Sequence, residues 1–283
     1  MNRVHLWLQP LLGTSRTTGG CQRASTLHHG RTPTFERMKK TILLLAAGMV
    51  LVGGCKNKDE EVLPDPHHNS VLSMAMHWWY GTEAFHTDSL FTDDFGHTIE
   101  VDEVLFYMGN PWFSDELGDS VAGFAGKYFL IDAAEGGLIR TIGEVDAHLH
   151  EMHVDLGLDS AASYSDISTA APPLNVGSMY WLWNGRVFAR VKGKVDLDGD
   201  GVMTVADGTF SYDCGSLSLL RHLLIEVHTD ANIGSNVILD FDVDVKRILQ
   251  GVDVVVEPVT HTDDDPVLAL QIIENLTAAI THP

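Results

Sequence analysis

Short hydrophobic runs separated by turn-forming residues recur along the chain from residue 71 onward. Many of them alternate apolar and polar side chains, which is the period of a half-buried β-strand. The pattern appears in residues 71–80, 98–107, 127–131, 148–158, 179–195, 210–214, 220–228 and 237–243. The dipeptide Asn184-Gly185 interrupts one run and is typical of a hairpin turn. No strand–helix–strand alternation occurs, so the pattern predicts a mainly β domain with an antiparallel, sandwich-like arrangement.

The period of the apolar residues changes near the C-terminus. Asp265 can cap the N-terminus of a helix, and Pro266 suits its first position. Apolar residues follow at helical spacing: Ala269, Ile272, Ile273, Leu276 and Ile280. They predict one C-terminal helix whose apolar stripe packs on the sheet. A shorter helical turn is expected at 245–249.

A different pattern precedes the strands. Two lysines follow Met38, and residues 41–52 form a mostly apolar segment that is too short to span a bilayer. A run of small residues then ends at Cys55, as in a bacterial lipobox, where the cysteine is acylated and becomes the N-terminus. We therefore predict a lipoprotein signal peptide over residues 38–54. The alternative is an ordinary secretory signal with an incidental cysteine.

The remaining segments complete the predicted organisation. Residues 1–37 show little periodicity and are interpreted as the product of an upstream start codon chosen in error. Residues 55–70 are polar and contain two prolines, which predicts a flexible tether. Residues 71–283 are expected to form one domain. Its only cysteine is Cys214, so no intrachain disulfide is predicted.

The charge distribution agrees with this division. The chain has 283 residues, with 18 Lys and Arg against 39 Asp and Glu, and a net charge of −21. Residues 1–54 contain seven of the basic residues and one of the acidic residues, so the predicted mature chain is still more acidic. Such a charge argues against a nucleic-acid partner, which needs a basic face. An excess of carboxylates suits divalent cations.

The most specific motif is an acidic loop of EF-hand type at residues 196–207. Acidic side chains occupy its positions 1, 3, 5 and 12, and Gly201 at position 6 allows the sharp turn. The predicted ligands are the carboxylates of Asp196, Asp198, Asp200 and Asp207, the backbone carbonyl of Val202, and Thr204, directly or through water. We expect one structural Ca²⁺ here. The alternative is a solvated acidic turn without an ion.

A second candidate metal site lies in the sequence HLHEMH. His148, His150 and Met152 alternate along a predicted strand and would share one face. Imidazole and thioether groups together suit copper, especially Cu(I). The alternative is a pair of exposed histidines on an edge strand. A weaker alternative is a metalloenzyme that uses Glu151 as its acid–base residue.

Further candidates lie in the first predicted strand, where His77 precedes Trp78 and Trp79. His77 could be a metal ligand or a hydrogen-bonded core histidine. Trp181 and Trp183 are predicted to share a face and to fill the core. Since no GxSxG, Gly-rich phosphate loop or HExxH motif occurs, we expect binding without enzymatic turnover.

The order of these segments resembles the MbnP-like family, copper-binding β-proteins of the periplasm or cell surface that are commonly lipoproteins in Bacteroidota. The most specific stretch is 177–188 (GSMYWLWNGRVF), which is similar to the family's GMxWxWxxGYxF-type segment. The other similar stretches are 104–110, 127–132, 153–160, 241–245 and 272–275. The similarity covers about residues 71–280.

This resemblance implies a β-sandwich-like fold and copper binding outside the cytoplasm. It also implies a role in copper acquisition or association with a di-haem peroxidase-like partner. A tryptophan near the copper would be oxidised to kynurenine, and four are candidates: Trp78, Trp79, Trp181 and Trp183. His77 matches the family's early-strand histidine. Asp213 stands where the family usually has another histidine, so this ligand would be lost or changed, and His148 and His150 could compensate.

The sequence as a whole therefore predicts a lipid-anchored extracytoplasmic protein that contacts the membrane through Cys55. It would bind copper through His77, His148, His150 and Met152, and calcium through the loop at 196–207. The alternative is an interaction module with the same fold, one structural calcium ion and no working copper site.

Overall fold

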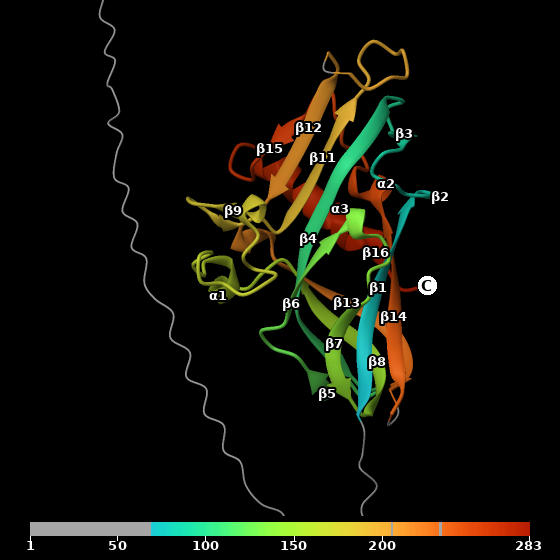
Figure 1. The fold of residues 1–283 in the computed structure, drawn as a ribbon, viewed down its shortest axis with the longest axis vertical. Coiled ribbons are helices and arrows are strands. Elements are labelled where there is room, and N and C mark those ends of the chain that lie inside the picture. Colours follow the sequence, from blue (N-terminus) through green and yellow to red (C-terminus); the bar gives the residue numbers. More distant parts are fainter. Residues whose placement is uncertain (1–68, 205, 232–233) are drawn as a thin grey trace, which may run out of the picture. The chain divides into compact units, whose positions relative to one another are not determined.

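The computed structural model describes residues 69–204, 206–231 and 234–283 (Figure 1). Its strands are β1 (Ser70–Tyr80), β2 (Glu83–Ala84), β3 (Leu90–Thr92), β4 (Thr98–Ser114), β5 (Ser120–Gly123), β6 (Tyr128–Asp132), β7 (Arg140–Val145), β8 (Ala147–Leu156), β9 (Tyr180–Trp181), β10 (Gly185–Arg186), β11 (Ala189–Val195), β12 (Gly208–Cys214), β13 (Arg221–Ala231), β14 (Asn236–Asp244), β15 (Val259–Thr260) and β16 (Ile280–Thr281). Its α-helices are α1 (Ser160–Ser163), α2 (Val245–Ile248) and α3 (Pro266–Ala279). Cys55, the predicted signal peptide and residues 55–68 of the predicted tether lie outside the described residues.

Two sheets account for most of the described strands. In the first sheet, β1 lies between β14 and β7, and β2 and β16 pair at its edges. In the second, β4 pairs with both β8 and β11, and β13 and β12 extend the sheet beyond them. The prediction of a mainly β, sandwich-like domain with one C-terminal helix is confirmed.

Two strand pairs differ from the antiparallel expectation. Strands β1 and β14 run parallel from the pair Val71↔Asn236 to the pair Trp79↔Asp244, and β12 and β15 are also parallel. No hairpin turn ties β1 to β14, because most of the domain lies between them in the sequence. Parallel strands need a long connection between them, and the chain between β1 and β14 provides one.

The inner faces of the two sheets share one hydrophobic core. Leu72 and Phe241 from the first sheet, and Phe106, Met152 and Val191 from the second, are at most 1% exposed. The alternation is regular at the outer ends of some strands, such as residues 98–102 of β4, but the middle of β4 is buried on both faces. The core therefore fixes which residues of each strand can reach a solvent-facing site.

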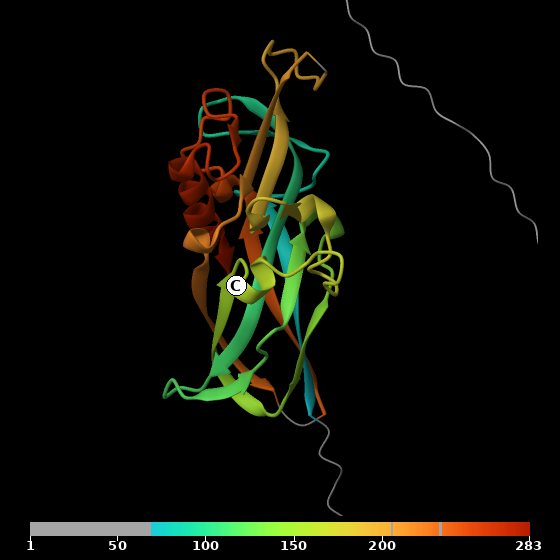
Figure 2. The ribbon, with the colours of Figure 1, turned by 90° about the vertical axis from the view of Figure 1, so that its left-hand side faces the viewer.

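Helix α3 confirms the C-terminal prediction. The carboxylate of Asp265 accepts hydrogen bonds from the backbone N–H groups of Val267 (3.1 Å) and Leu268 (3.0 Å), and Pro266 is the first helical residue. The apolar stripe is buried, and the helix contacts α2, β12 and β13. Figure 2 shows α3 beside the sheets, whereas the loop after β11 projects from one end. No helix in the described part of the chain is long and apolar enough to cross a membrane.

Candidate metal sites

The predicted calcium loop connects β11 to β12. The two strands pair from Ala189↔Cys214 to Val195↔Gly208, so the hairpin brings both ends of the loop together. One carboxylate oxygen from each of Asp196, Asp198 and Asp207 lies within 4.8 Å of the other two. Oxygen atoms bound to one Ca²⁺ at about 2.4 Å can be at most roughly 4.8 Å apart. Three carboxylate oxygens are therefore close enough together to contact one such ion.

Backbone N–H groups hold two of these carboxylates in place. Asp196 accepts hydrogen bonds from Gly201 (2.8 Å) and Gly199 (2.7 Å), and Asp207 accepts one from the N–H of Thr204 (2.7 Å). The bond from Gly201 is the main cause that lowers the pKa of Asp196, and the bond from Thr204 lowers the pKa of Asp207. Gly201 has a φ of 78°, which glycine adopts readily. Both carboxylates are thus charged and oriented.

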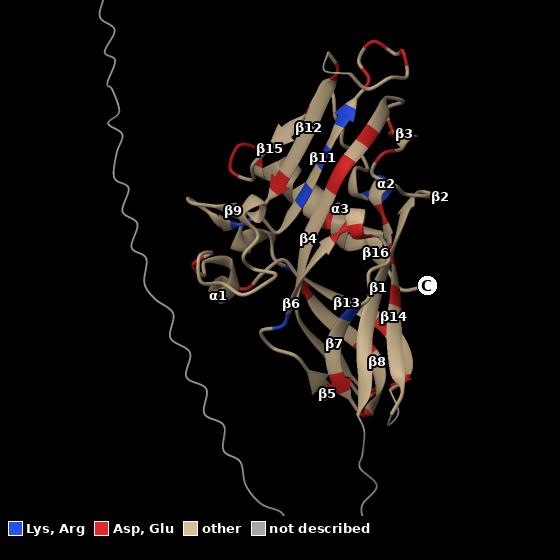
Figure 3. Ribbon diagram, viewed as in Figure 1, with Lys and Arg blue, Asp and Glu red and all other residues tan. Residues whose placement is uncertain are grey.

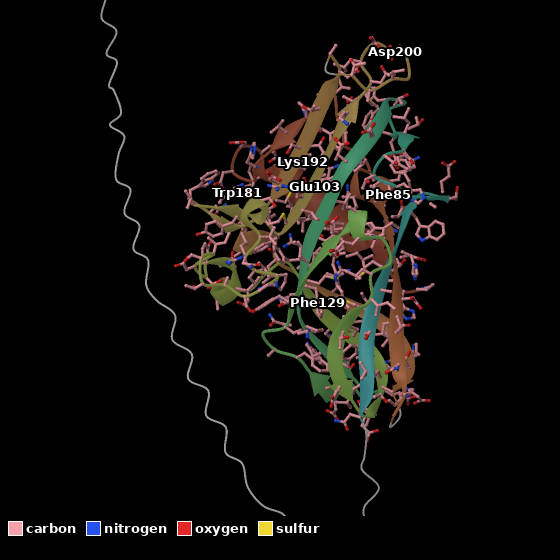
Figure 4. All side chains as sticks on the ribbon, viewed as in Figure 1. Phe85, Glu103, Phe129, Trp181, Lys192 and Asp200 are labelled. Atoms are coloured by element: carbon pink, nitrogen blue, oxygen red, sulfur yellow. The ribbon has the colours of Figure 1, made fainter. Side chains whose placement is uncertain are left out.

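The other predicted calcium ligands lie outside this group of three. Asp200, labelled in Figure 4, accepts a hydrogen bond from the N–H of Val202 (2.8 Å). The Thr204 hydroxyl donates to Asp207 (2.9 Å). The structure therefore brings together three of the four predicted carboxylates. Figure 3 shows acidic residues in this loop, which projects beyond β11 and β12.

His77 lies on the exposed outer side of β1. Its Nε2 is 2.9 Å from Oδ1 of Asp240 on β14, and Trp79 donates from Nε1 to Oδ1 of Asp242 (2.8 Å). A carboxylate can only accept a hydrogen bond, so Nε2 of neutral His77 carries the proton and Nδ1 keeps its lone pair. Metal-binding histidines commonly have such a carboxylate partner on the second ring nitrogen.

A cleft of about 490 Å³ adjoins His77 and is also lined by Trp79, Phe85 and His86. Phe85 is labelled in Figure 4. His86 was not among the candidate ligands predicted from the sequence. The signal that could have indicated it is Gly81, directly after the predicted strand 71–80, because glycine allows a tight turn; its φ is 64°. This turn folds β2 back along β1 and brings His86 to the cleft that His77 lines.

The predicted shared face of His148, His150 and Met152 does not form. Met152 is fully buried, whereas His148 is exposed and its Nδ1 lies 2.5 Å from Oδ1 of Asp230. The reason is that the regular alternation of β8 is interrupted. Leu149 and Met152 both enter the core although they are three positions apart. The shared-face prediction is therefore wrong, and Met152 is a core residue.

Asp213 takes part in a buried ion pair. It lies opposite Arg190 in the β11–β12 ladder, and the two side chains are 6% and 7% exposed. Arg190 donates from Nη2 to Oδ2 of Asp213 (3.0 Å), and its Nε makes a second bond to Oδ1. This carboxylate is already bound to a guanidinium group, so it is not a free metal ligand.

The tryptophans occupy different environments. Trp181 is buried and labelled in Figure 4, but Trp183 is 72% exposed and stacks on it with ring centroids 5.7 Å apart. The prediction that both fill the core is therefore wrong for Trp183, because it precedes the hairpin turn at Asn184 and Gly185. Trp78 is buried, and Trp79 is partly exposed beside the cleft.

The fold and these sites define a β-rich domain with one carboxylate-lined loop and one imidazole-lined cleft. The family model for MbnP matches residues 69–263, so the chain belongs to the MbnP family. The structure of MbnP from Methylosinus trichosporium is similar with a TM-score of 0.46 and 11% identity, covering 65% of this chain and 79% of that chain. No curated protein sequence matches the chain.

Proposed function

We propose that this protein is an extracytoplasmic, lipid-anchored metal-binding protein that binds copper at the cleft beside His77 and a structural Ca²⁺ in the loop at 196–207. Membership of the MbnP family supports the copper assignment. The observation that carries it is the hydrogen bond between His77 and Asp240 at a cleft that a second histidine, His86, also lines.

In this proposal, His77 and His86 supply two imidazole nitrogens, a donor type that suits copper. Asp240 fixes the ring of His77 and leaves its Nδ1 for the metal. Trp79 lines the same cleft, and we assign to it the oxidation to kynurenine that the family resemblance implies. Because His77 and Trp79 are exposed, a copper-uptake or di-haem peroxidase-like partner could reach them directly.

The calcium ion has a different role in this proposal. Asp196 and Asp207 stand at the two ends of the β11–β12 loop, and Asp198 lies close to both. An ion bound by all three carboxylates would tie the loop ends together and stiffen the hairpin. None of its three carboxylate ligands lines the copper cleft, so we assign it no part in copper binding.

Copper binding is tested by measuring copper per chain in the full-length protein, solubilised in detergent, and in its variants. His77→Ala and His86→Ala should each lower the copper content strongly. His222→Ala is the matched control, because His222 is also exposed and bonded to a carboxylate, Asp155. A copper content that is unchanged in both cleft variants would refute this location. A kynurenine-type mass gain on the Trp79 peptide would support it.

Lipid anchoring needs its own test because Cys55 lies outside the described residues. Cys55→Ser should release the protein from the membrane fraction. Continued membrane retention of this variant would refute the lipid anchor. It would leave the metal sites unaffected, because their ligands all lie beyond residue 70.

A second candidate function is a calcium-stabilised binding module without a working copper site. One observation favours it: Asp213, at the position of a usual family histidine, is committed to Arg190. In that case the purified protein would contain calcium but no copper, and it would take up no copper on reconstitution. The metal content therefore separates the two candidates.

A further inference from the structure

The outer face of the β8–β13 pair carries a row of histidines that the proposed function does not use. They are His148, His150, His153, His222 and His228, all at least partly exposed. Four of them lie within ion-pair distance of a carboxylate: His148 with Asp230, His153 with Glu151, His222 with Asp155, and His228 with Glu226. In the described part of the chain, His150 has no such partner.

His150 instead meets the ring of His228. The two ring centroids are 4.4 Å apart, and the ring planes are perpendicular. Two imidazoles on one tetrahedral Zn²⁺ ion, with Zn–N distances of about 2.0–2.1 Å, have centroids roughly 5 Å apart. The two rings are therefore close enough that rotation of both side chains could bring one nitrogen of each to a common ion.

A β-bulge creates this contact. The ladder between β8 and β13 is regular up to Glu226↔Glu151 and resumes at Thr229↔Leu149, so Val227 and His228 together face the single residue His150. Val227 enters the core, and His228 is exposed with a φ of 39°, a left-handed conformation that few non-glycine residues adopt. Bulges redirect a side chain in this way.

The charges around the histidine pair favour a cation. Glu151 and Glu226 lie directly opposite each other in the ladder, and like charges in this position are destabilising. Glu226 also has Oε2 3.5 Å from Nε2 of His228. A bound cation would offset this repulsion, and rotation of the Glu226 side chain could bring an oxygen ligand to it.

We propose that His150 and His228, with the carboxylate of Glu226, form a second metal site for a divalent transition-metal ion of the Zn²⁺ type. Two nitrogens and one oxygen from the protein suit Zn²⁺ and leave one coordination position for water or a partner's ligand. The site lies on β8 and β13, whereas the residues of the copper cleft come from β1 and the segment after β2. It therefore does not depend on the proposed copper function.

The test is a titration of the full-length protein with Zn²⁺, in which isothermal titration calorimetry measures the affinity. The protein is solubilised in detergent and saturated with Ca²⁺. His150→Ala and His228→Asn should each weaken this Zn²⁺ affinity at least about tenfold, since loss of even an outer-shell partner costs about 10–100-fold. Asparagine is chosen at position 228 because it tolerates a positive φ, so the bulge can persist.

Two control variants make the result specific. His222→Ala removes a histidine on the same face and should leave the affinity unchanged. His77→Ala should also leave it unchanged, which separates this site from the copper cleft. Zn²⁺ binding that survives both His150→Ala and His228→Asn, or that weakens equally in His222→Ala, would overturn the proposal. Circular dichroism of each variant establishes that the fold is retained.

Discussion

Replacing Asp213 with alanine should destabilise the domain more than any surface charge change. The substitution leaves the guanidinium of Arg190, which is buried between strands, without its counter-charge and without two hydrogen bonds. Removing one partner of a buried ion pair costs about 3–5 kcal/mol. For a domain of this size, each kcal/mol corresponds to roughly 2–4 °C in Tm. We therefore expect Tm to fall by roughly 6–20 °C.

The matched control is an ion pair between β11 and the neighbouring strand β4. Lys192 and Glu103, both labelled in Figure 4, form a longer and more exposed pair at 3.9 Å. Such pairs contribute about 0–1 kcal/mol, so Glu103→Ala should change stability little. The double variant Arg190→Met with Asp213→Leu should recover most of the loss, because no charge is then left buried.

Urea unfolding followed by tryptophan fluorescence measures these free energies, with thermal unfolding as a second probe. The reasoning requires a large loss for Asp213→Ala, a small one for Glu103→Ala and recovery in the double variant. If Asp213→Ala costs no more than Glu103→Ala, the ion pair is not structural. Asp213 would then be available for another role, including metal binding.

Three further predictions concern other parts of the domain. Added Ca²⁺ should raise Tm, and Asp207→Ala should abolish that increase, as thermal unfolding with and without a chelator can show. Cys214 should react with a thiol reagent only when the protein unfolds, because it is fully buried and burial raises the pKa of its thiol. Burial alone would raise the pKa of Asp159, but hydrogen bonds from Tyr128, Ala162 and Asn110 outweigh it and lower this pKa. The stabilisation from Asp159 should therefore be complete above its unfolded pKa of about 3.9 and be lost as the pH falls through its folded value. Asp159→Asn should flatten the stability profile below about pH 4, measured by urea unfolding.

Local patterns were sufficient to predict most of the long elements. The hydrophobic runs predicted as strands in 71–80 and 148–158 correspond to β1 and β8, and the cap at Asp265 with Pro266 begins α3. Strands such as β2 and β3 were not predicted, because two or three residues are too few to show a period. The candidate calcium loop at 196–207 could be predicted from the sequence because its candidate ligands all lie in one continuous segment.

Features that depend on how two strands pair were not predictable from the local pattern of either strand. The bulge opposite His150 is a property of the β8–β13 register, so alternation along β8 alone placed Met152 wrongly on the histidine face. The Arg190–Asp213 pair likewise requires the β11–β12 register. His86 reaches the cleft because β2 folds back on β1, a turn for which Gly81 is the sequence signal. In each case the sequence shows the residue but not the residues that lie beside it in the folded domain.

The most direct test of the proposed function is the metal content of the full-length protein isolated from the cell envelope, with copper and calcium measured per chain. We predict about one calcium ion and about one copper ion at the cleft, the latter lost in His77→Ala and retained in His222→Ala. Calcium without copper would contradict the central claim and favour the binding module. Copper that persists in His77→Ala would place the copper site elsewhere.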